Sequence, residues 1–539
     1  MTKRTGLLSV LAVGILLTGC GQKSVEQRPA AECKPIAEYE TYDTVIVDSL
    51  DDVPQDCKSI LLSAYEIKGD EGFDYENEEQ LYYQYDPVSF AFYPTLDCFE
   101  YIVVVPESAA DQAFEQVTQR PLKRLGLNDI NMTDLDALSQ MPELETLWMG
   151  GCDCKANFSG SFATLTDLQC YWTNIDKLGD IPKITTLQRL SLHGTEMHSI
   201  KGIEKLTNLS KLDLSDTDIY SLKPLRTMTQ LTSLNISDMG SLTHRTVPDL
   251  RILSGMTNLK TLGLNDCRYG VKHPEALSAL TSLEYFSAVD SKLDSVELLQ
   301  PLVKMRVLDL RANKIADLSP LTGMTELEEL MLHSNLLTGI EPVTELKHLK
   351  RLTIGHNDII DITPIEELPE LEYLSVYLCA NLSDIKPLLQ SKSLKELDIR
   401  STKVTDTEVI GEMRDLEKLD ISGTKISDIT FLENLKKLRE LGLSGLKIKD
   451  IVPLLGLSRL EKLDLSNTQV MDIEGISRLH ELYELKLNST NVESIEELKE
   501  MPSLQKVYLE NCRRLDREDV EAYQAEMEER GGMVGTNYH

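Results

Sequence analysis

Two cysteines and a tryptophan stand close together in the segment LWMGGCDC, residues 147–154. The pair Cys152 and Cys154 could coordinate zinc or cycle between a dithiol and a disulfide. Other catalytic patterns are missing, since the sequence holds no G-x-S-x-G, no H-E-x-x-H and no Gly-Lys pair of a phosphate-binding loop. We therefore expect no enzymatic activity and no cofactor, and the role of the cysteines depends on the elements that carry them.

Those elements are short repeats, which begin at Leu122 and continue to residue 515. LKRLGLNDI at 122, LSKLDLSDTDI at 209 and LEKLDLSNTQV at 460 fit the pattern L-x-x-L-x-L-x-x-N-x-L. The alternating leucines have the period of a strand that buries one face, and one such unit cannot bury its apolar side alone. Stacked units predict an α/β solenoid, a curved horseshoe with a parallel sheet on its concave side.

We expect about eighteen repeats over residues 121–515, and many of them are 22 residues long. Their first residues are 122, 144, 168, 187, 209, 231, 259, 283, 305, 327, 349, 371, 394, 416, 438, 460, 482 and 504. Segments such as DLSPLTGMTELEEL (317–330) resemble the leucine-rich repeats of bacterial internalins and of the SDS22-like subfamily. The resemblance implies the fold, but no immunoglobulin-like module or LPxTG signal follows the repeats, so host-cell adhesion is not implied.

The repeat pattern gives the cysteines a place, if positions are counted from the first leucine of each repeat. Cys152 falls on the ninth position, where the pattern has Asn or Cys, and Cys154 falls on the eleventh, which is usually Ile or Leu. Polar side chains at the ninth position are expected to pair with backbone groups at the turn. We therefore predict two core residues rather than a metal site or a redox pair.

Residues between the inward positions should face the concave side, where a partner could bind. Trp148 occupies the fifth position, Trp172 is placed at the same position of the next repeat, and His193 lies on the strand after that. Exposed tryptophans are frequent in binding hot spots. Two interpretations stay open: these residues bind a partner, or the N-terminal region folds against them.

A second group of candidate partner-binding residues occupies the seventh position of successive repeats. Its members are Arg311, His333, Tyr377 and Arg400, with Gly355 between them and His356 beside that glycine. Arg, His and Tyr in one stripe suggest a pocket for an acidic or planar group. The alternative is a solvated surface on which nearby aspartates, such as Asp309 and Asp398, neutralise the arginines.

The chain begins MTKRTGLLSVLAVGILLTGC, a basic segment followed by a short apolar run. This pattern predicts a signal peptide at residues 1–19. Leu17-Thr18-Gly19-Cys20 resembles a bacterial lipobox, which implies that Cys20 carries a diacylglyceryl group and that residues 20–32 form a lipidated tether. The expected location is the extracytoplasmic side of a bacterial cell envelope, with the lipid as the membrane contact.

Residues 33–120 are acidic and rich in tyrosine. Apolar runs predict strands at 42–48, 59–67 and 101–105 and a helix at 108–119, in a small α/β or β-rich domain or an end cap. Cys33, Cys57 and Cys98 could supply one disulfide in an exported protein. At the other end, residues 516–539 form a capping helix and a tail, with Asp516 as N-cap and Gly531 as its stop.

The formal net charge of −33 argues against nucleic acid binding through phosphates. We expect a surface-anchored, non-enzymatic protein whose concave face binds another protein. The alternative is an envelope lipoprotein that captures carbohydrate or peptide, with Trp148 and Trp172 as a stacking platform.

Overall fold

A computed structural model of the chain describes residues 45–47, 49–64, 99–130, 135–152, 158, 160–239 and 247–536. The chain divides into two compact units, with the boundary between Leu293 and Asp294. Unit 1 precedes this boundary, unit 2 follows it, and each is described by itself. In the described ranges, no helix has the length and the apolar character needed to cross a membrane.

Unit 1 is built on a parallel sheet in the order β1-β3-β2-β4, after which the strands follow in chain order to β11. Its strands are β1 (Val45–Val47), β2 (Ser59–Ser63), β3 (Tyr101–Val104), β4 (Arg124–Asn128), β5 (Thr146–Gly150), β6 (Asp167–Tyr171), β7 (Arg189–Ser191), β8 (Lys211–Asp213), β9 (Ser233–Asn235), β10 (Thr261–Gly263) and β11 (Tyr285–Ser287). Its helices are α2 (Ala110–Val117) and the short 3₁₀ turns η2 (Leu50–Asp52), η5 (Glu107–Ala109), η6 (Asp136–Gln140), η7 (Ile181–Lys183), η8 (Ile203–Lys205), η9 (Lys223–Thr227), η10 (Leu250–Gly255) and η11 (Pro274–Ala279).

Unit 2 repeats the same design, with parallel strands that pair in chain order from β12 to β22. Its strands are β12 (Val307–Asp309), β13 (Glu329–Met331), β14 (Arg351–Thr353), β15 (Tyr373–Ser375), β16 (Glu396–Asp398), β17 (Lys418–Asp420), β18 (Glu440–Gly442), β19 (Lys462–Asp464), β20 (Glu484–Lys486), β21 (Lys506–Tyr508) and β22 (Met533–Gly535). Its helices are α3 (Thr407–Glu412), α4 (Arg517–Glu529), η12 (Glu297–Leu299), η13 (Ser319–Leu321), η14 (Glu341–Glu345), η15 (Thr363–Glu367), η16 (Lys386–Gln390), η17 (Thr430–Asn434), η18 (Val452–Leu454), η19 (Ile476–Arg478) and η20 (Glu496–Glu500).

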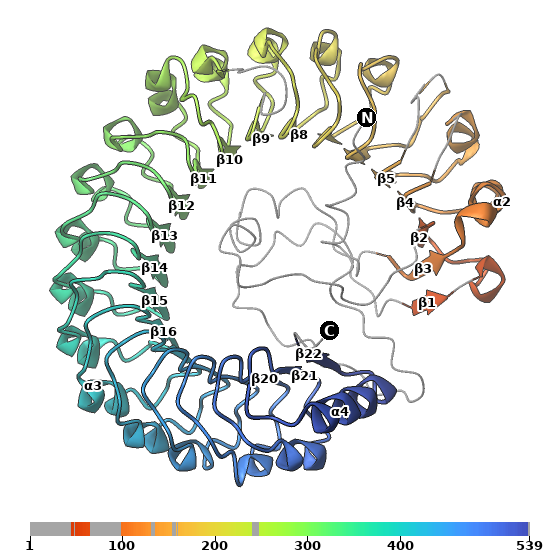
Figure 1. The fold of residues 1–539 in the computed structure, drawn as a ribbon. Helices are drawn as coiled ribbons and strands as arrows, with labels where there is room; N and C mark the ends of the chain where they lie inside the picture. The colour runs from red at the N-terminus through yellow and green to blue at the C-terminus, as the bar shows by residue number, and fades with distance from the viewer. Residues whose placement is uncertain are drawn as a thin grey trace. The chain divides into compact units, whose positions relative to one another are not determined.

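In each unit the strands line the inner, concave curve and the helical turns lie on the outer side (Figure 1). The predicted solenoid is confirmed, and each expected repeat contributes one strand, β4 to β21. Leu212 and Leu214, at the fourth and sixth positions, are fully buried. In β19, Lys462 is exposed and Leu463 is buried, so the third and fifth positions face the concave side.

Polar side chains at the ninth position pair with backbone groups at the turn, as expected, and some of them also join neighbouring repeats. Asn335 donates through Nδ2 to the carbonyl oxygens of Leu310 and Leu332, both at 2.9 Å, and accepts from the backbone N–H of Ile315 at 3.0 Å. Cys152 takes the same place and lies 3.4 Å from the carbonyl oxygen of Leu127. Backbone groups of the turn are thereby paired inside the stack. Cys154 lies outside the described residues.

The N-terminal strands β1 to β3 extend the sheet of the repeats, because β2 pairs directly with β4. At the other end, Asp516 caps α4 by accepting from Glu518 and Asp519, and Tyr523 is buried on the helix face that covers the last repeat. The helix and its N-cap therefore lie where the sequence predicted them. The sequence analysis did not predict β22, which pairs with β21 and completes the sheet.

One cysteine expectation changes. Cys57 is a free, buried thiol whose Sγ lies 3.4 Å from the carbonyl oxygen of Ser59, so it is not part of a disulfide. Cys33, Cys98 and the lipobox residue Cys20 lie outside the described residues, and the expectations for them stay predictions. Cys170 is fully buried at the sixth position of its repeat.

Candidate functional site

Trp148 has the expected position but not the expected accessibility. It lies on the concave face of β5, between Gly126 of β4 and Gln169 of β6. Only 4% of it is exposed, because it packs in an apolar cluster with Leu61, Phe99 and other concave side chains of unit 1. The absence of a side chain at Gly126 makes room for this cluster, since a β-carbon there would lie 2.6 Å from Leu61 Cδ1. Trp148 is therefore part of a core and not an exposed contact residue.

The predicted place of Trp172 is wrong by three residues. Leu168 pairs with Leu147, so the third repeat begins at Leu165 and Gln169 takes the fifth position. Trp172 instead occupies the turn after β6, where its backbone is left-handed with φ +52°. The sequence is ambiguous here because Leu165 and Leu168 both suit the first position. The tryptophans thus have different positions in their repeats, and the predicted stacking platform does not form.

Trp172 and His193 do come together, as an edge-to-face pair with ring centroids 5.2 Å apart. The indole of Trp172 lies over Gly194, where a β-carbon would come within 2.7 Å of it. His193 Nδ1 lies 2.8 Å from Ser215 Oγ. Burial lowers the pKa of His193, and Asp213 opposes this effect only partly. The pair is a partly buried aromatic contact with a neutral histidine.

In unit 2, Arg311 is not available to a partner. It is 6% exposed and forms a forked ion pair with Asp309, with Nε–Oδ1 at 2.8 Å and Nη2–Oδ2 at 2.6 Å. A guanidinium held in both branches by one carboxylate is already satisfied. For this residue, the expectation of a free anion-binding group is wrong and the paired alternative holds.

His333, Tyr377 and Arg400 do form one continuous group, which we call the concave cluster. The ring of Tyr377 lies over Gly355, two residues after the end of β14, and its hydroxyl lies 3.4 Å from His333 Nδ1. The guanidinium of Arg400 lies 5.3 Å from the centre of the Tyr377 ring, a cation–π distance. All three residues are partly exposed.

The two ends of the concave cluster differ in charge. The pKa of His333 is lowered to about 3 by burial and by the positive charges of Arg311 and His356, so its ring is neutral. Arg400 forks onto Asp398, with both N–O distances at 3.0 Å, and its Nε is 3.5 Å from Asp420. Its side chain nevertheless keeps 40% exposure. Arg400 is therefore the charged group through which a partner can reach the cluster.

His356 lies off the concave face, in the turn after β14, with φ +51°. Its side chain is exposed, and Nδ1 lies 3.0 Å from Ser334 Oγ. It is close in sequence to the concave cluster but faces the edge of the sheet.

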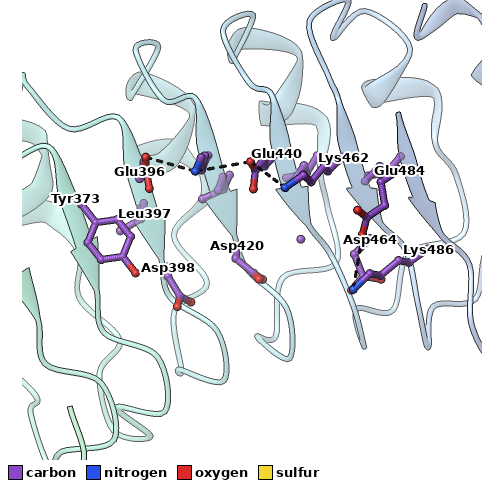
Figure 2. Close-up of a pocket in the computed structure, with 15 residues that line it drawn as sticks. Tyr373, Glu396, Leu397, Asp398, Asp420, Glu440, Lys462, Asp464, Glu484 and Lys486 are labelled. Carbon is purple, nitrogen blue, oxygen red and sulfur yellow. Dashed lines mark ion pairs between the residues drawn. The ribbon is translucent and has the colours of Figure 1, made fainter. Parts of the chain in front are cut away.

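A shallow hollow of about 280 Å³ adjoins the concave cluster on β15 to β20. Figure 2 shows charges of opposite sign alternating along its third-position row, from Glu396 to Glu484. Lys418 lies 3.6 Å from both Glu396 and Glu440, so the row neutralises itself. The alternating third letters of LKELDI, LEKLDI, LRELGL and LEKLDL carry this signal, which the sequence analysis missed.

A family model described as Leucine Rich repeats (2 copies) matches residues 414–456 and, in an overlapping copy, 436–478. Those residues contain β17, β18 and β19 of the repeat stack. This chain therefore has the leucine-rich repeat fold. No curated protein sequence matches it.

Solved structures of other leucine-rich repeat proteins are similar to it. An internalin, InlF of Listeria monocytogenes, is 29% identical over 60% of this chain and 88% of its own, with a TM-score of 0.46. A Leptospira interrogans leucine-rich repeat protein is 21% identical over 78% and 98%, with a TM-score of 0.45. TLR13, in a complex with ssRNA13, is 21% identical over 75% and 71%, with a TM-score of 0.50, and this likeness supports the fold alone.

The arrangement is suited to contact chemistry. Within the described ranges, no three His, Cys, Asp or Glu side chains gather as metal ligands. The groups that this leucine-rich repeat protein offers on unit 2 are an aromatic ring, a neutral imidazole and a partly exposed guanidinium. These are groups that bind another surface by packing and hydrogen bonding.

Proposed function

We propose that this leucine-rich repeat protein is a non-enzymatic binding protein that holds a protein partner on the concave face of unit 2. The observation that carries the proposal is the concave cluster, in which Tyr377 spans Gly355 to join His333 and leaves Arg400 partly exposed. Tyr and Arg are enriched in the hot spots of protein interfaces, and a ring fixed between two neighbours loses little entropy on binding.

The charges around the concave cluster support a protein rather than a nucleic acid as the partner. The chain carries a formal charge of −33, and Arg400 has two carboxylates close to it. A phosphate backbone would meet this acidic surface with few free cations to neutralise it. The RNA in the TLR13 complex therefore gives no guide to the ligand of this chain.

The experiment is capture of partners from envelope and host-cell extracts by residues 21–539, compared with a Tyr377→Ala/Arg400→Ala variant. We expect a partner that the variant loses. A Tyr220→Ala/Arg459→Ala variant is the control, because it removes the same side-chain types from exposed positions that are not part of the concave cluster. Equal capture by all three proteins would refute the proposed site.

We also propose that Cys20 anchors the protein to the outer side of a bacterial membrane. The support is the sequence LTGC after a basic and apolar leader. An alkyne fatty acid fed to the producing cells should label the full chain and not the Cys20→Ala variant, while Cys33→Ala keeps the label. Equal labelling of the wild type and Cys20→Ala would contradict the anchor.

A further inference from the structure

The turn after each strand from β12 to β21 contains a residue with a left-handed backbone, and in two adjacent repeats this residue has a large side chain. In the other repeats the eighth position holds a small or amide residue: Ala312, Ser334, Ser401, Gly423, Gly445, Asn467, Ser489 and Asn511. His356 and Leu378 stand at this position with φ +51° and +55°. Such a backbone is unfavourable for a bulky side chain like that of Leu378. Strain of this kind persists where it serves a function.

Burial of these side chains does not offset the strain, because both are exposed. Leu378 is 37% exposed and His356 is also exposed. Leu336 and Ile360, in the turns of the two preceding repeats, are 57% and 60% exposed. Three consecutive repeats therefore carry an exposed apolar residue in the segment after the strand, at the tenth, twelfth and eighth positions. We call Leu336, His356, Ile360 and Leu378 the edge cluster, because large exposed side chains in successive repeats are a feature of interaction sites.

The edge cluster is continuous with the concave cluster through the backbone. The N–H of His356 donates to the carbonyl oxygen of Tyr377 at 2.7 Å, and the N–H of Leu378 donates to that of Arg400 at 2.9 Å. The turns of these repeats therefore lie side by side. A chain that contacts Tyr377 on the concave face can pass directly onto Leu378.

Positive charge follows the edge cluster along the same edge. The tenth positions of the next three repeats hold Lys403, Lys425 and Lys447, and all three side chains are exposed. Lys403 donates to Asn381 Oδ1 at 2.7 Å, and none of the three forms an ion pair within the described part of the chain. Neighbouring lysines without counter-charges repel one another, and an acidic partner relieves that repulsion.

We propose that this edge of unit 2 binds a polypeptide segment in which an apolar side chain is followed by carboxylates. The apolar side chain packs on Leu336 and Leu378, and the carboxylates meet Lys403, Lys425 and Lys447. The inference rests on the proposed function, to which it adds the chemistry of the partner. It also extends the contact surface from the concave face to the edge.

The first test needs no ligand. Leu378→Asn in the full chain replaces a strained residue with one that accepts the left-handed turn, so the melting temperature should rise by about 1–3 °C. Ser401→Asn, at the same position in the next repeat, serves as the control and should change it less. A lower melting temperature for Leu378→Asn would show that the leucine stabilises the fold, and would remove the argument from strain.

The second test selects binders to the full chain from a random-peptide display library. We expect enriched peptides to combine Leu or Phe with Asp or Glu, and to lose binding to Leu378→Asn and to Lys403→Glu/Lys425→Glu/Lys447→Glu. A Lys392→Glu/Arg414→Glu/Arg459→Glu variant carries the same charge change on exposed residues away from this edge and should still bind. Enrichment of other compositions, or equal binding to all variants, would overturn the proposal.

Two further arms separate the alternatives. Vesicles of phosphatidylcholine with and without phosphatidylglycerol test a membrane as the acidic partner, and lysine-dependent binding to the anionic vesicles alone would overturn the peptide proposal. Tyr377→Ala/Arg400→Ala tests the concave cluster. If this variant loses the extract partner while the edge variants keep it, the proposed function stands and the edge proposal fails.

Discussion

The ring of Tyr377 occupies the space above Gly355, where a β-carbon would lie 2.3 Å from the tyrosine Cδ1. The glycine is thus the condition for the contact between Tyr377 and His333 on the far side of it. The same device recurs in unit 1, where Trp172 covers Gly194 and meets His193. In each unit, a missing side chain lets an aromatic ring reach a histidine in another repeat.

Gly355→Ala should therefore displace Tyr377 from His333 and weaken partner capture. The overlap should cost about 1–3 kcal/mol of unfolding free energy, the usual range for an overpacked site. Denaturant unfolding and the capture assay measure the two effects. Gly323→Ala is the matched control, because a β-carbon there lies 3.6 Å from Val303 and fits. If Gly355→Ala captures the partner as well as the wild type does, the position of the Tyr377 ring is not needed for binding.

Substitution of Arg311 should mainly reduce stability, whereas substitution of Arg400 should mainly reduce binding. The side chain of Arg311 is 7% exposed and that of Asp309 is fully buried, so Arg311→Ala leaves a buried carboxylate without its partner. This should cost about 3–5 kcal/mol and leave the affinity of the folded protein unchanged. Arg400→Ala should cost less and reduce partner capture. The opposite pattern, with binding lost in folded Arg311→Ala, would show that the partner reaches the buried pair.

Stability should fall in mild acid because of His333. Its pKa is lowered to about 3 in the folded chain, whereas an unperturbed histidine has 6.5. Between these pH values, His333 is protonated in the unfolded chain and neutral in the folded chain. The stabilising contribution is therefore fully present above pH 6.5 and declines as the pH falls toward 3. The loss should be on the order of a few kcal/mol.

His333→Gln tests this dependence, because it removes the titrating group. The difference in unfolding free energy between pH 7 and pH 4 should shrink in this variant. His480→Gln, which changes an exposed histidine, should keep the wild-type difference. An equal pH dependence in all three proteins would place the acid sensitivity elsewhere.

Trp148 should behave as a core residue. Trp148→Ala removes a 4% exposed side chain from its cluster with Leu61 and Phe99, and should cost about 3–5 kcal/mol. The cost should appear as a lower denaturation midpoint for unit 1, with partner capture by folded protein unchanged. If Trp148→Ala lost partner capture but kept its stability, Trp148 would be a contact residue and not a core residue.

The row of alternating charges on unit 2 should respond to salt. Lys418→Glu places a third carboxylate between Glu396 and Glu440, where the wild-type ammonium lies 3.6 Å from each. The like charges should lower the unfolding free energy by about 1 kcal/mol at low ionic strength, and 1 M salt should remove most of the difference. Lys392→Glu is an exposed control with the same charge change. A salt-independent loss would indicate a packing effect.

The sequence predicted the parts of the fold that repeat. Leu212 and Leu214 are inward because a strand has a period of two. Helix α4 begins directly after Asp516 because a capping residue is recognised from the local sequence. The burial of Trp148 depends on Leu61 and Phe99, which are far away in the chain and belong to no repeat. A pattern with a short period carries no information about such contacts.

The site residues divide in the same way. Tyr377 and Arg400 were correctly placed on one stripe, since their repeat register is regular. The contact of Tyr377 with His333 depends on the missing side chain of Gly355. The sequence analysis searched for side chains that could bind a partner, so it assigned no role to a glycine. Trp172 was misplaced because two leucines three residues apart competed for one position. The edge cluster was not predicted because its residues lie in the turns, and the sequence analysis considered only the positions that face the core or the concave side.

The ninth-position asparagines have a consequence for how such an array changes length. Asn335 bonds to its own repeat and to the one before it, so a repeat with such a side chain at the ninth position carries a group that completes its predecessor. A duplicated repeat of this kind carries its own hydrogen bonds to the preceding repeat, while α4 and β22 still cover the C-terminal end. The protein can therefore grow or shrink internally by whole repeats without redesign of its ends, and each addition widens its inner face by one strand spacing, about 4.8 Å.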